Sequence, residues 1–465
     1  MSNYKPIDPE FDPMTFKMNE EEVGDTPENR SGHPETLYPE LQDSQRIAVD
    51  RYFSKEFMEQ EWDKMWTRTW SCAGRVSDLP TPGSYFRYDL GPESFIIIRG
   101  HDDKIRAFYN VCPHRARQFI ESEAGVVAEL VCPHHSWAFD LKGQCTRVTD
   151  QEVFDSHALC GDLSLKSVLC DTWAGFVFIN MDSGAQSLLE YLGPVAGLLE
   201  PYRLEDMFVV KDAVLPIKSN WKVGLDIFLE AYHLHSTHPQ ALGGTEDYYV
   251  QTDVYENGHG RQISPVGVPS IRLKDQKTVN SLLRYIMEDA GMDPDAFSGT
   301  ATEVRAALEQ HKRKPDNKYG LDYSKFSPSQ VTDDWNFFVF PNMTLNTHPE
   351  GVLVIRFLPH PKDPETFYYH VLIIVPKLKE GCTTPFYMGL EKEADISGKV
   401  RPARKYTTAS SPQMGEVLDQ DIGNMESTQK GLRSRSFTGG MRFGSHELRD
   451  MVMHAELNRY LRDQK

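Results

Sequence analysis

The sequence predicts an α+β protein in which a small antiparallel β domain precedes a larger α+β domain with a central antiparallel sheet. Between Trp70 and Asn180, short β-rich runs alternate with turns. Beyond Ser187, strand and helix patterns are mixed. The 465 residues, 39% hydrophobic and 25% charged, have the composition of an ordinary globular protein and suffice for two or three packed units.

The net charge of −18, from 50 Lys+Arg against 68 Asp+Glu, argues against nucleic acid and anionic lipid as partners. No apolar run approaches the about 20 residues of a membrane helix, and the acidic, Pro-rich N-terminus is unlike a signal peptide. We therefore expect a cytoplasmic protein with no membrane partner. The seven cysteines, an odd number, do not suggest a disulfide framework and are expected to be metal ligands or free thiols.

Residues 1–45 contain eleven acidic and three basic residues and six prolines, and are expected to form an extended arm. Residues 46–66 carry apolar side chains at near-helical spacing among charges. They are expected to form an amphipathic helix that docks on the larger α+β domain. These side chains are Ile47, Tyr52, Phe53, Phe57, Trp62 and Trp66.

The small β domain is assigned to residues 67–183 and the larger domain to residues 184–465. In the first, strands are expected at 95–98, 105–109 and 175–179. In the second, strands are expected at 208–215, 335–345, 352–357 and 367–375, and helices around Ala231 and at 278–290, 301–311 and 448–461. Thr300 and Glu303 form a capping-box pattern at the start of the third of these helices. Residues 273–329 are interpreted as a helical insert or lid.

One group of candidate metal ligands lies in the β domain, at Cys112-Pro113-His114 and Cys132-Pro133-His134-His135. Zinc ribbons usually carry Cys-x-x-Cys pairs. One Cys and one His per loop is instead the ligand set of a Rieske [2Fe–2S] centre, with two thiolates on one iron and two imidazoles on the other. His134 could also reach a metal, but the Cys-x-x-His spacing favours His135. We therefore expect Cys112, His114, Cys132 and His135 to bind the cluster.

This part of the chain resembles the Rieske domain of the non-haem iron oxygenases. The resemblance lies in the segments 110–115 and 132–137 and in the turn at 140–143. In that family an aromatic residue usually stands where this chain has His134.

A second group of candidate ligands contains Glu230, His233 and His238. Two imidazoles and one carboxylate form the facial triad of a non-haem Fe(II) centre. On an ideal helix, residues five apart point ~140° away from each other, so the helix must loosen before Pro239 if both imidazoles bind one metal. Glu230 lies one turn from His233 and Asp226 one turn further back, so a carboxylate can orient the imidazole.

The resemblance implies that His233 and His238 bind the iron and that Glu230 links the two metal centres, where many members have Asp. The third ligand is expected in a segment that resembles the family's aspartate-bearing segment, at Asp421. Asp419, two residues earlier, is the competing candidate. The resemblance extends over most of residues 45–460.

These features predict the terminal oxygenase component, the large subunit, of a Rieske non-haem iron system that uses dioxygen. The chain shows neither a Gly-x-Gly-x-x-Gly fingerprint nor a plant-type ferredoxin cysteine run. Electrons are therefore expected from NAD(P)H through a reductase, with or without a ferredoxin. The resemblance implies a homotrimer, with or without a small beta subunit, in which the cluster of one subunit faces the iron of the next.

Hydroxylation of an aromatic or other apolar carbon ranks first as the expected reaction. Oxidative N- or O-demethylation ranks close behind, because Glu230 resembles the branch that attacks quaternary amines. A zinc-stabilised binding protein is the alternative of a different class. Candidates for a substrate pocket, each of which fits a hydrophobic core equally well, are Phe228, Leu234, Phe338 and Leu345.

Overall fold

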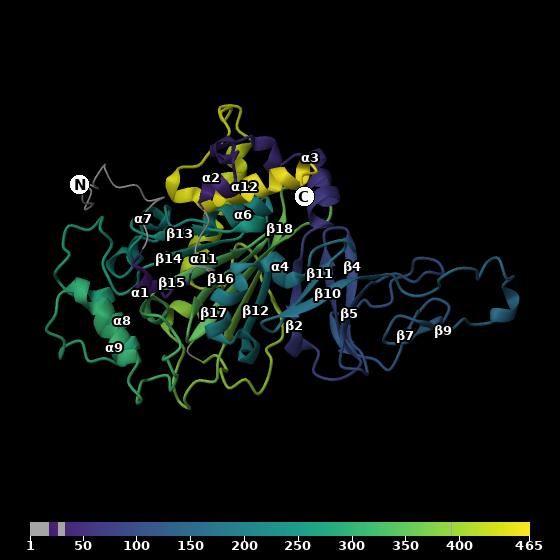
Figure 1. Ribbon diagram of the computed structural model, residues 1–465, viewed down its shortest axis with the longest axis horizontal. Helices are drawn as coiled ribbons and strands as arrows, with labels where there is room; N and C mark the ends of the chain where they lie inside the picture. The colour runs from purple at the N-terminus through teal and green to yellow at the C-terminus, as the bar shows by residue number, and fades with distance from the viewer. Residues whose placement is uncertain (1–17, 27–32, 392) are drawn as a thin grey trace. The chain divides into compact units, whose positions relative to one another are not determined.

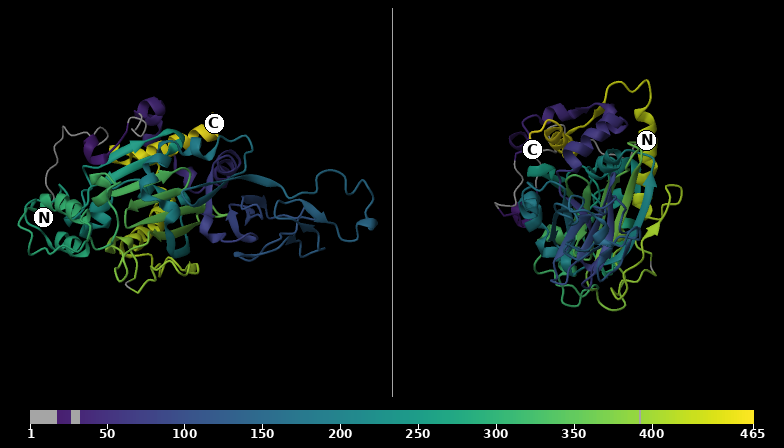
Figure 2. Two further views of the ribbon diagram at one scale, coloured as in Figure 1. Left: turned by 60° about the horizontal axis from the view of Figure 1, so that its bottom comes forward. Right: turned by 90° about the vertical axis from the view of Figure 1, so that its right-hand side faces the viewer.

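The computed structural model describes residues 18–26, 33–391 and 393–465, which divide into two compact units (Figures 1 and 2). Unit 1 contains the described residues up to Glu61, Leu192–Pro359 and Asp363–Lys465. Unit 2 contains Trp62–Tyr191 and His360–Lys362. None of the described helices is long and apolar enough to cross a membrane.

Unit 2 is built on a seven-stranded antiparallel sheet with the order β2-β11-β10-β5-β4-β3-β6, and a separate three-stranded sheet, β7-β8-β9 (Figure 1). The strands are β2 (Ser71–Arg75), β3 (Ser84–Leu90), β4 (Glu93–Arg99), β5 (Ile105–Tyr109), β6 (Ala124–Val126), β7 (Leu130–Val131), β8 (Ala138–Phe139), β9 (Cys145–Arg147), β10 (Ser167–Trp173) and β11 (Phe176–Asn180). Ile96 and Ile98 of β4 share one hydrophobic core with Cys112 and Cys132. The larger sheet therefore supports the two cysteine loops.

Unit 1 contains the predicted central sheet, with the order β13-β14-β15-β16-β17-β18-β12-β19. Its strands are β12 (Phe208–Ile217), β13 (Gln251–Val254), β14 (Gly260–Ser264), β15 (Asp334–Val339), β16 (Met343–His348), β17 (Gly351–Pro359), β18 (Phe367–Val375) and β19 (Lys405–Tyr406). Neighbouring strands are antiparallel except β12 and β19, which are parallel. This confirms the predicted fold class.

Two helices bring the candidate iron ligands together in unit 1. Helix α6 (Trp221–Phe228) packs against β17 and β18, and α11 (Glu416–Leu432) packs against α6 and β12. The approach of α6 to the sheet is close, because a Cβ on Gly224 would lie 2.5 Å from the ring of Phe367. Glycine at this position therefore lets the helix sit directly on the sheet.

The remaining helices are short, apart from the C-terminal one. They are α3 (Lys55–Glu61), α4 (Leu188–Leu192), α5 (Pro194–Leu198), α7 (Leu234–Thr237), α8 (Ser281–Asp289), α9 (Val304–Lys312), α10 (Pro328–Thr332) and α12 (Leu448–Leu461). Helices α8 and α9 of the predicted insert lie together at one end of unit 1 (Figures 1 and 2). The predicted capping box is present, with the Thr300 N–H donating to Glu303 Oε2 at 2.7 Å.

The prediction of one helix over residues 46–66 is wrong. Residues 46 and 47 form strand β1 (Arg46–Ile47), which pairs with β20 (Met441–Arg442). A 3₁₀ turn (Val49–Tyr52) follows, and the helix begins only at α3, where the Ser54 hydroxyl accepts a hydrogen bond from the Phe57 N–H at 3.1 Å. A π-helical turn (Trp62–Trp66) ends the segment. Ser54 favours a helix start, and the β1–β20 pairing overrides the helical spacing before it.

The predicted extended arm is also wrong where the structure describes it, in residues 18–26 and 33–45. Two short helices occur there, α1 (Glu20–Val23) and α2 (Pro34–Leu37). The other residues of the expected arm, 1–17 and 27–32, lie outside the described residues.

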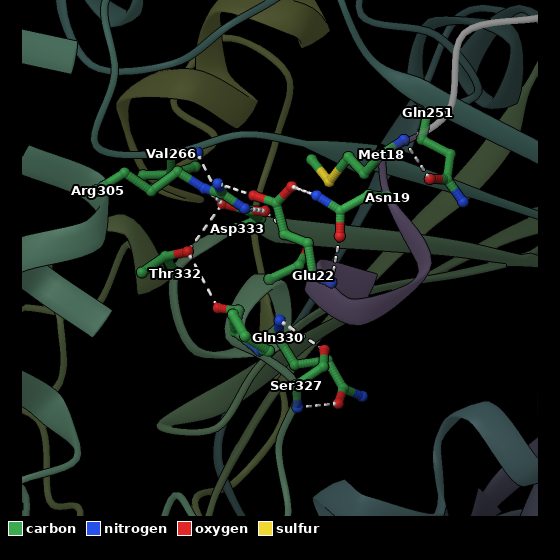
Figure 3. A network of polar contacts seen from close by, with 12 residues as sticks. Met18, Asn19, Glu22, Gln251, Val266, Arg305, Ser327, Gln330, Thr332 and Asp333 are labelled. Atoms are coloured by element: carbon green, nitrogen blue, oxygen red, sulfur yellow. Dashed lines mark hydrogen bonds and ion pairs between the residues drawn. The ribbon is translucent and has the colours of Figure 1, made fainter. Parts of the chain in front are cut away.

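Acidic residues of the arm contact two arginines of unit 1, Arg261, which is buried, and Arg305, which is half-buried. Glu22 pairs with Arg305 of α9, which also contacts Asp333 (Figure 3). Asp25 accepts two hydrogen bonds from the fully buried Arg261, at 3.0 and 2.9 Å. The acidic residues that suggested an extended arm therefore attach it to unit 1.

Replacing Asp25 with Asn should test this attachment. Among the described residues Arg261 would keep only Asp253 as an anionic partner, so the free energy of unfolding should fall by about 1.5–3 kcal/mol, as for hydrogen bonds to a charged group. The exposed neighbour Glu21, changed to Gln, is the control and should stay within about 0.5 kcal/mol. Urea denaturation measures both. Equal stability of the two variants would show that the arm is not held by this ion pair.

Candidate metal centres

The two cysteine loops of unit 2 have the same backbone design. The Cys112 N–H donates to the Arg117 carbonyl at 2.9 Å, and the Cys132 N–H donates to the Trp137 carbonyl at 2.8 Å. In each loop the fourth residue after the cysteine has a left-handed conformation, with φ of 60° at both Ala116 and Ser136. Each loop therefore turns back on itself and presents its cysteine and histidine together.

The side chains of these loops converge. The rings of His114 and His135 lie 4.6 Å apart, and Trp137 stacks on His114 with ring centroids 4.7 Å apart. Cys112 and Cys132 are both buried free thiols. Burial raises the pKa of the Cys112 thiol to about 11, so a thiolate there needs a neighbouring cation such as iron.

His135 and His134 differ in their surroundings. His135 is half-buried, and its Nδ1 is buried without a hydrogen-bond partner among the described residues. His134 is exposed, with its ring 3.7 Å from that of His135. A buried nitrogen lone pair without a donor suits a metal ligand, so the residues present fit the cluster that the spacing predicts.

The second group of ligands comes together in unit 1. His238 Nε2 lies 2.8 Å from Asp421 Oδ1, and His233 Nε2 lies 3.5 Å from the same oxygen. In the described part of the chain, these three residues are the one group of three or more His, Cys, Asp or Glu residues whose ligand atoms all lie within 4.8 Å of one another. His238 and Asp421 are buried, and His233 is half-buried.

The backbone loosens between the two histidines, as their spacing requires. Helix α6 ends at Phe228, and the single turn α7 ends before His238, whose φ of −121° and ψ of 52° are not helical. The expected helix around Ala231 is therefore absent, and Glu230 lies in a loop rather than on the helical face shared with His233. Pro239, which cannot continue a hydrogen-bonded helix, begins a 3₁₀ turn.

Hydrogen bonds fix the direction of both imidazoles. His233 Nδ1 donates to Glu230 Oε1 at 2.7 Å, and His238 Nδ1 donates to Gln420 Oε1 at 2.7 Å. In a neutral imidazole the other nitrogen, Nε2, then carries a lone pair. Both lone pairs face Asp421 Oδ1, and such a group of acceptors is stabilised by a cation between them. The residues present therefore fit a divalent metal.

The charges at this site shift two pKa values in opposite directions. Burial acts to lower the pKa of His233, but the charges of Glu230 and Asp421 and the hydrogen bonds to them raise it to about 10. Without a metal His233 therefore keeps a proton on Nε2, and a bound cation would take the place of that proton. Burial acts to raise the pKa of Asp421, but hydrogen bonds from the two imidazoles and their charges lower it. The carboxylate is thus kept ionised and ready to bind a cation.

The structure separates Asp421 from Asp419. Asp421 is buried and contacts both histidines, whereas Asp419 Oδ1 accepts a hydrogen bond from the Met414 N–H at 2.9 Å near the start of α11. Side chains that are two residues apart on a helix point in different directions, so only one of Asp419 and Asp421 can face α7.

Asp226 does not orient a ligand imidazole, contrary to expectation. Its Oδ2 accepts a hydrogen bond from the Tyr52 hydroxyl at 2.9 Å, and Glu230 holds His233 instead. Sequence reasoning missed Gln420, which precedes Asp421 and orients His238; nothing in its local pattern marks it.

The pocket candidates divide into two pairs. Phe338 and Leu345 lie fully buried in the central sheet and belong to the core. Phe228 and Leu234 are half-buried and flank the segment that carries Glu230 and His233.

Family models match both parts of the chain. Residues 204–463 match the Ring hydroxylating alpha subunit (catalytic domain), and residues 69–158 match the Rieske [2Fe-2S] domain. The chain belongs to the ring-hydroxylating alpha subunit family. The matches confirm the expected [2Fe–2S] cluster and mononuclear iron as the cofactors of this alpha subunit, and they overturn the zinc alternative.

The alpha subunit is similar to several characterised proteins. It is 33% identical over 211 residues to the carnitine monooxygenase oxygenase subunit of Escherichia coli (strain K12), covering 44% of this chain and 55% of that one. It is 32% identical over 197 residues to the 2,4-dinitrotoluene dioxygenase system, large oxygenase component, of Burkholderia sp. (strain RASC), covering 41% of this chain and 44% of that one. The alignments thus span about half the length of these relatives.

A solved structure shows the same fold over more of the alpha subunit. The crystal structure of the quaternary ammonium Rieske monooxygenase CntA in complex with L-carnitine covers 92% of this chain and 99% of its own, with a TM-score of 0.61 and 21% identity.

Asparagine variants should distinguish the two candidate carboxylates of the alpha subunit. Asp421→Asn should lose the mononuclear iron, because it removes the anion that both imidazoles face. Asp419→Asn should keep the iron and lose at most about 1 kcal/mol of stability, because the amide oxygen can still accept the hydrogen bond from the Met414 N–H. Iron content relative to protein, together with the visible spectrum of the cluster, measures the outcome. Iron loss in Asp419→Asn but not in Asp421→Asn would reverse the assignment.

Proposed function

We propose that the alpha subunit is the terminal oxygenase component of a Rieske non-haem iron system. The convergence of His233, His238 and Asp421 carries this proposal, because two imidazoles and one carboxylate form the ligand set of oxygen-activating iron. The Rieske domain in the same chain supplies the second redox centre that this chemistry needs.

Each group of residues has a role in this reaction. When bound, the mononuclear iron supplies dioxygen activation and the [2Fe–2S] cluster supplies electrons. Cys112, Cys132, His114 and His135 would hold the cluster. His233, His238 and Asp421 would hold the mononuclear iron by three positions and leave the others for dioxygen.

Glu230 is proposed to connect the two centres. It accepts hydrogen bonds from both the backbone N–H and Nδ1 of His233, at 2.9 and 2.7 Å, so one carboxylate oxygen fixes the backbone and the other fixes the imidazole. We propose a homotrimer in which Glu230 also accepts a hydrogen bond from the cluster-bound His135 of a neighbouring subunit. A reductase is the proposed source of electrons. A ferredoxin and a small beta subunit are the optional components.

Two substrate classes have support. The similarity to the carnitine monooxygenase oxygenase subunit, together with a glutamate at position 230, supports oxidation of a methylated or quaternary amine. The similarity to the large component of 2,4-dinitrotoluene dioxygenase supports oxygenation of an aromatic or other apolar compound, the class that ranked first from the sequence.

Turnover tests the proposed function directly. Iron-replete protein supplied with a reductase, NAD(P)H and dioxygen should convert a member of one of these two classes in an oxygen-dependent reaction, followed by mass spectrometry. Glu230→Gln should keep both metals but slow product formation at least tenfold, because the neutral amide no longer anchors His233 as a carboxylate does. Lack of oxygen-dependent product from both classes, with both metals present, would contradict the proposal.

The cluster ligands are tested by a matched pair of variants. Cys132→Ser should abolish the visible absorbance of the cluster and its reduced-state EPR signal, because it removes one thiolate ligand. His134→Ala should keep both signals, because the exposed imidazole is not assigned as a ligand. Signal loss in His134→Ala and retention in Cys132→Ser would show that the wrong residues were assigned.

A further inference from the structure

A group of buried ionisable side chains lies beside Glu230 but binds neither proposed metal. Tyr52 comes from the 3₁₀ turn before α3, Asp226 from α6, and Asp450 and His454 from one face of α12. Tyr52, Asp450 and His454 are completely buried, and Asp226 is 8% exposed. All four belong to unit 1.

Hydrogen bonds link three of the four. The Tyr52 hydroxyl lies 2.9 Å from Asp226 Oδ2 and 3.0 Å from His454 Nε2. A tyrosine has one proton to donate, so it donates to the carboxyl oxygen and accepts from the Nε2–H of His454. Burial, together with the charges of Arg51 and Lys222, lowers the pKa of His454 well below its usual value, so this imidazole is neutral.

Several carboxyl oxygens in this group have no donor. Asp226 Oδ1 and both Oδ1 and Oδ2 of Asp450 are buried without a hydrogen-bond partner among the described residues. An ionised carboxylate in such surroundings loses its hydration, and the Tyr52 hydrogen bond to Asp226 and the charges of Lys222 and Arg449 replace only part of it. A protonated carboxyl avoids most of this cost.

The nearby cations do not neutralise the charge that these carboxyl groups would carry when ionised. Lys222, one turn before Asp226, pairs with Glu61 at 2.6 Å. The Arg449 guanidinium donates to the carbonyls of Phe228, Leu229 and Asn336 and to the Asn336 side chain. Each cation is thus held mainly by other partners, and neither makes an ion pair with Asp226 or Asp450 among the contacts of the described residues.

The nearby anions add to the effect of burial. Burial, with the charges of Glu447 and Glu230, raises the pKa of Asp226 to about 8, although the Tyr52 hydrogen bond and Lys222 act to lower it. Burial, with the charges of Asp226, Glu230 and Glu447, raises the pKa of Asp450 well above its usual value, against the effect of Arg449.

We propose that Asp226 and Asp450 hold protons in the resting enzyme and, with Tyr52 and His454, form a buried proton-donor site for the oxygenase reaction. The proposal rests on the proposed function. Contacts place this site next to the iron ligands. Asp226 lies four residues before Glu230, whose carboxylate holds His233. Arg449, the neighbour of Asp450, donates hydrogen bonds to the carbonyls of Phe228 and Leu229, directly before Glu230.

Oxygenation needs such a donor whichever substrate is used. Monooxygenation converts a C–H bond, O₂, two electrons and two protons into C–OH and water, and dioxygenation converts a C=C bond with the same electrons and protons into a diol. The reductase supplies the electrons. In the proposed step a carboxyl O–H bond breaks, the proton passes to reduced oxygen, and the carboxylate is reprotonated from solvent before the next turnover.

Infrared spectroscopy of the holoenzyme tests whether the protons are present, without reference to turnover. At pH 7 the protein should show a carboxylic-acid C=O band that shifts in D₂O and is lost or reduced in both Asp226→Asn and Asp450→Asn. Asp212→Asn is the control. Asp212 is equally buried, and although burial acts to raise its pKa, His370 and Arg404 lower it, so it contributes no such band. If both variants keep the wild-type band, so that the wild-type-minus-variant difference spectra show no carboxylic-acid band, the proposal is overturned.

The pH dependence of stability gives a second test with a defined sign. A carboxyl whose pKa is about 8 when folded and near 4 when unfolded binds a proton only in the folded state between these values, so stability should fall as pH rises from about 4 to about 8. Asp226→Asn should remove part of this fall. Its stability relative to the wild-type protein should therefore be higher at pH 8 than at pH 5. An unchanged pH profile in Asp226→Asn would contradict proton binding there.

Turnover then tests the donor role. Asp226→Asn and Asp450→Asn should reduce kcat at least tenfold, change its pH profile and divert reducing equivalents from product to hydrogen peroxide, with both metals retained. Tyr52→Phe, which keeps the ring but removes the link to His454, is the conservative variant and should show a smaller loss. Wild-type coupling and pH profile in the two aspartate variants would overturn the donor role. Absence of product from the wild-type enzyme would instead count against the proposed function, and the infrared result would still decide whether the protons are held.

Discussion

The contact of one carboxylate oxygen with two imidazoles determines the arrangement of the catalytic unit. Asp421 Oδ1 meets His238 Nε2 across 183 residues of sequence, so α11 must lie against the α6–α7 segment. The same contact requires α6 to end at Phe228, since a continuous helix would turn one histidine away. The eight-stranded sheet provides the surface on which both helices are fixed, and Gly224 allows α6 to approach it closely.

Buried charge around this contact is divided between groups that are paired and groups that are not. Glu230 and Gln420 each take the Nδ1–H of one imidazole and leave Nε2 directed at Asp421. Asp226 on α6 and Asp450 on α12 have few hydrogen-bond donors and few cations to stabilise their ionised forms. The first arrangement suits metal binding, and the second suits holding protons. One region of the fold thus contains both requirements of a reaction that consumes electrons and protons together.

Local spacing was sufficient to predict the parts of the sites that are close in sequence. The Cys-x-His and Cys-x-x-His pairs each occupy one loop, and the strands with alternating or continuous apolar residues formed as expected. Asp421 could be chosen over Asp419 only through the resemblance to a family, because the reason for the choice is a contact with α7. The roles of Tyr52, His454 and Asp450 were not visible in the sequence, since they depend on the packing of α12 and a 3₁₀ turn against α6. The charge and proline content gave a wrong prediction of an extended arm, because Asp25 and Glu22 form ion pairs with the buried Arg261 and the half-buried Arg305.

The position of the mononuclear iron tests the central claim most directly. Crystals of iron-loaded protein measured on both sides of the iron absorption edge should give, besides the peak of the [2Fe–2S] cluster, one anomalous peak bounded by His233 Nε2, His238 Nε2 and a carboxylate oxygen of Asp421. A fully loaded protein with no iron between these three side chains, or with its iron at Asp419, would contradict the account.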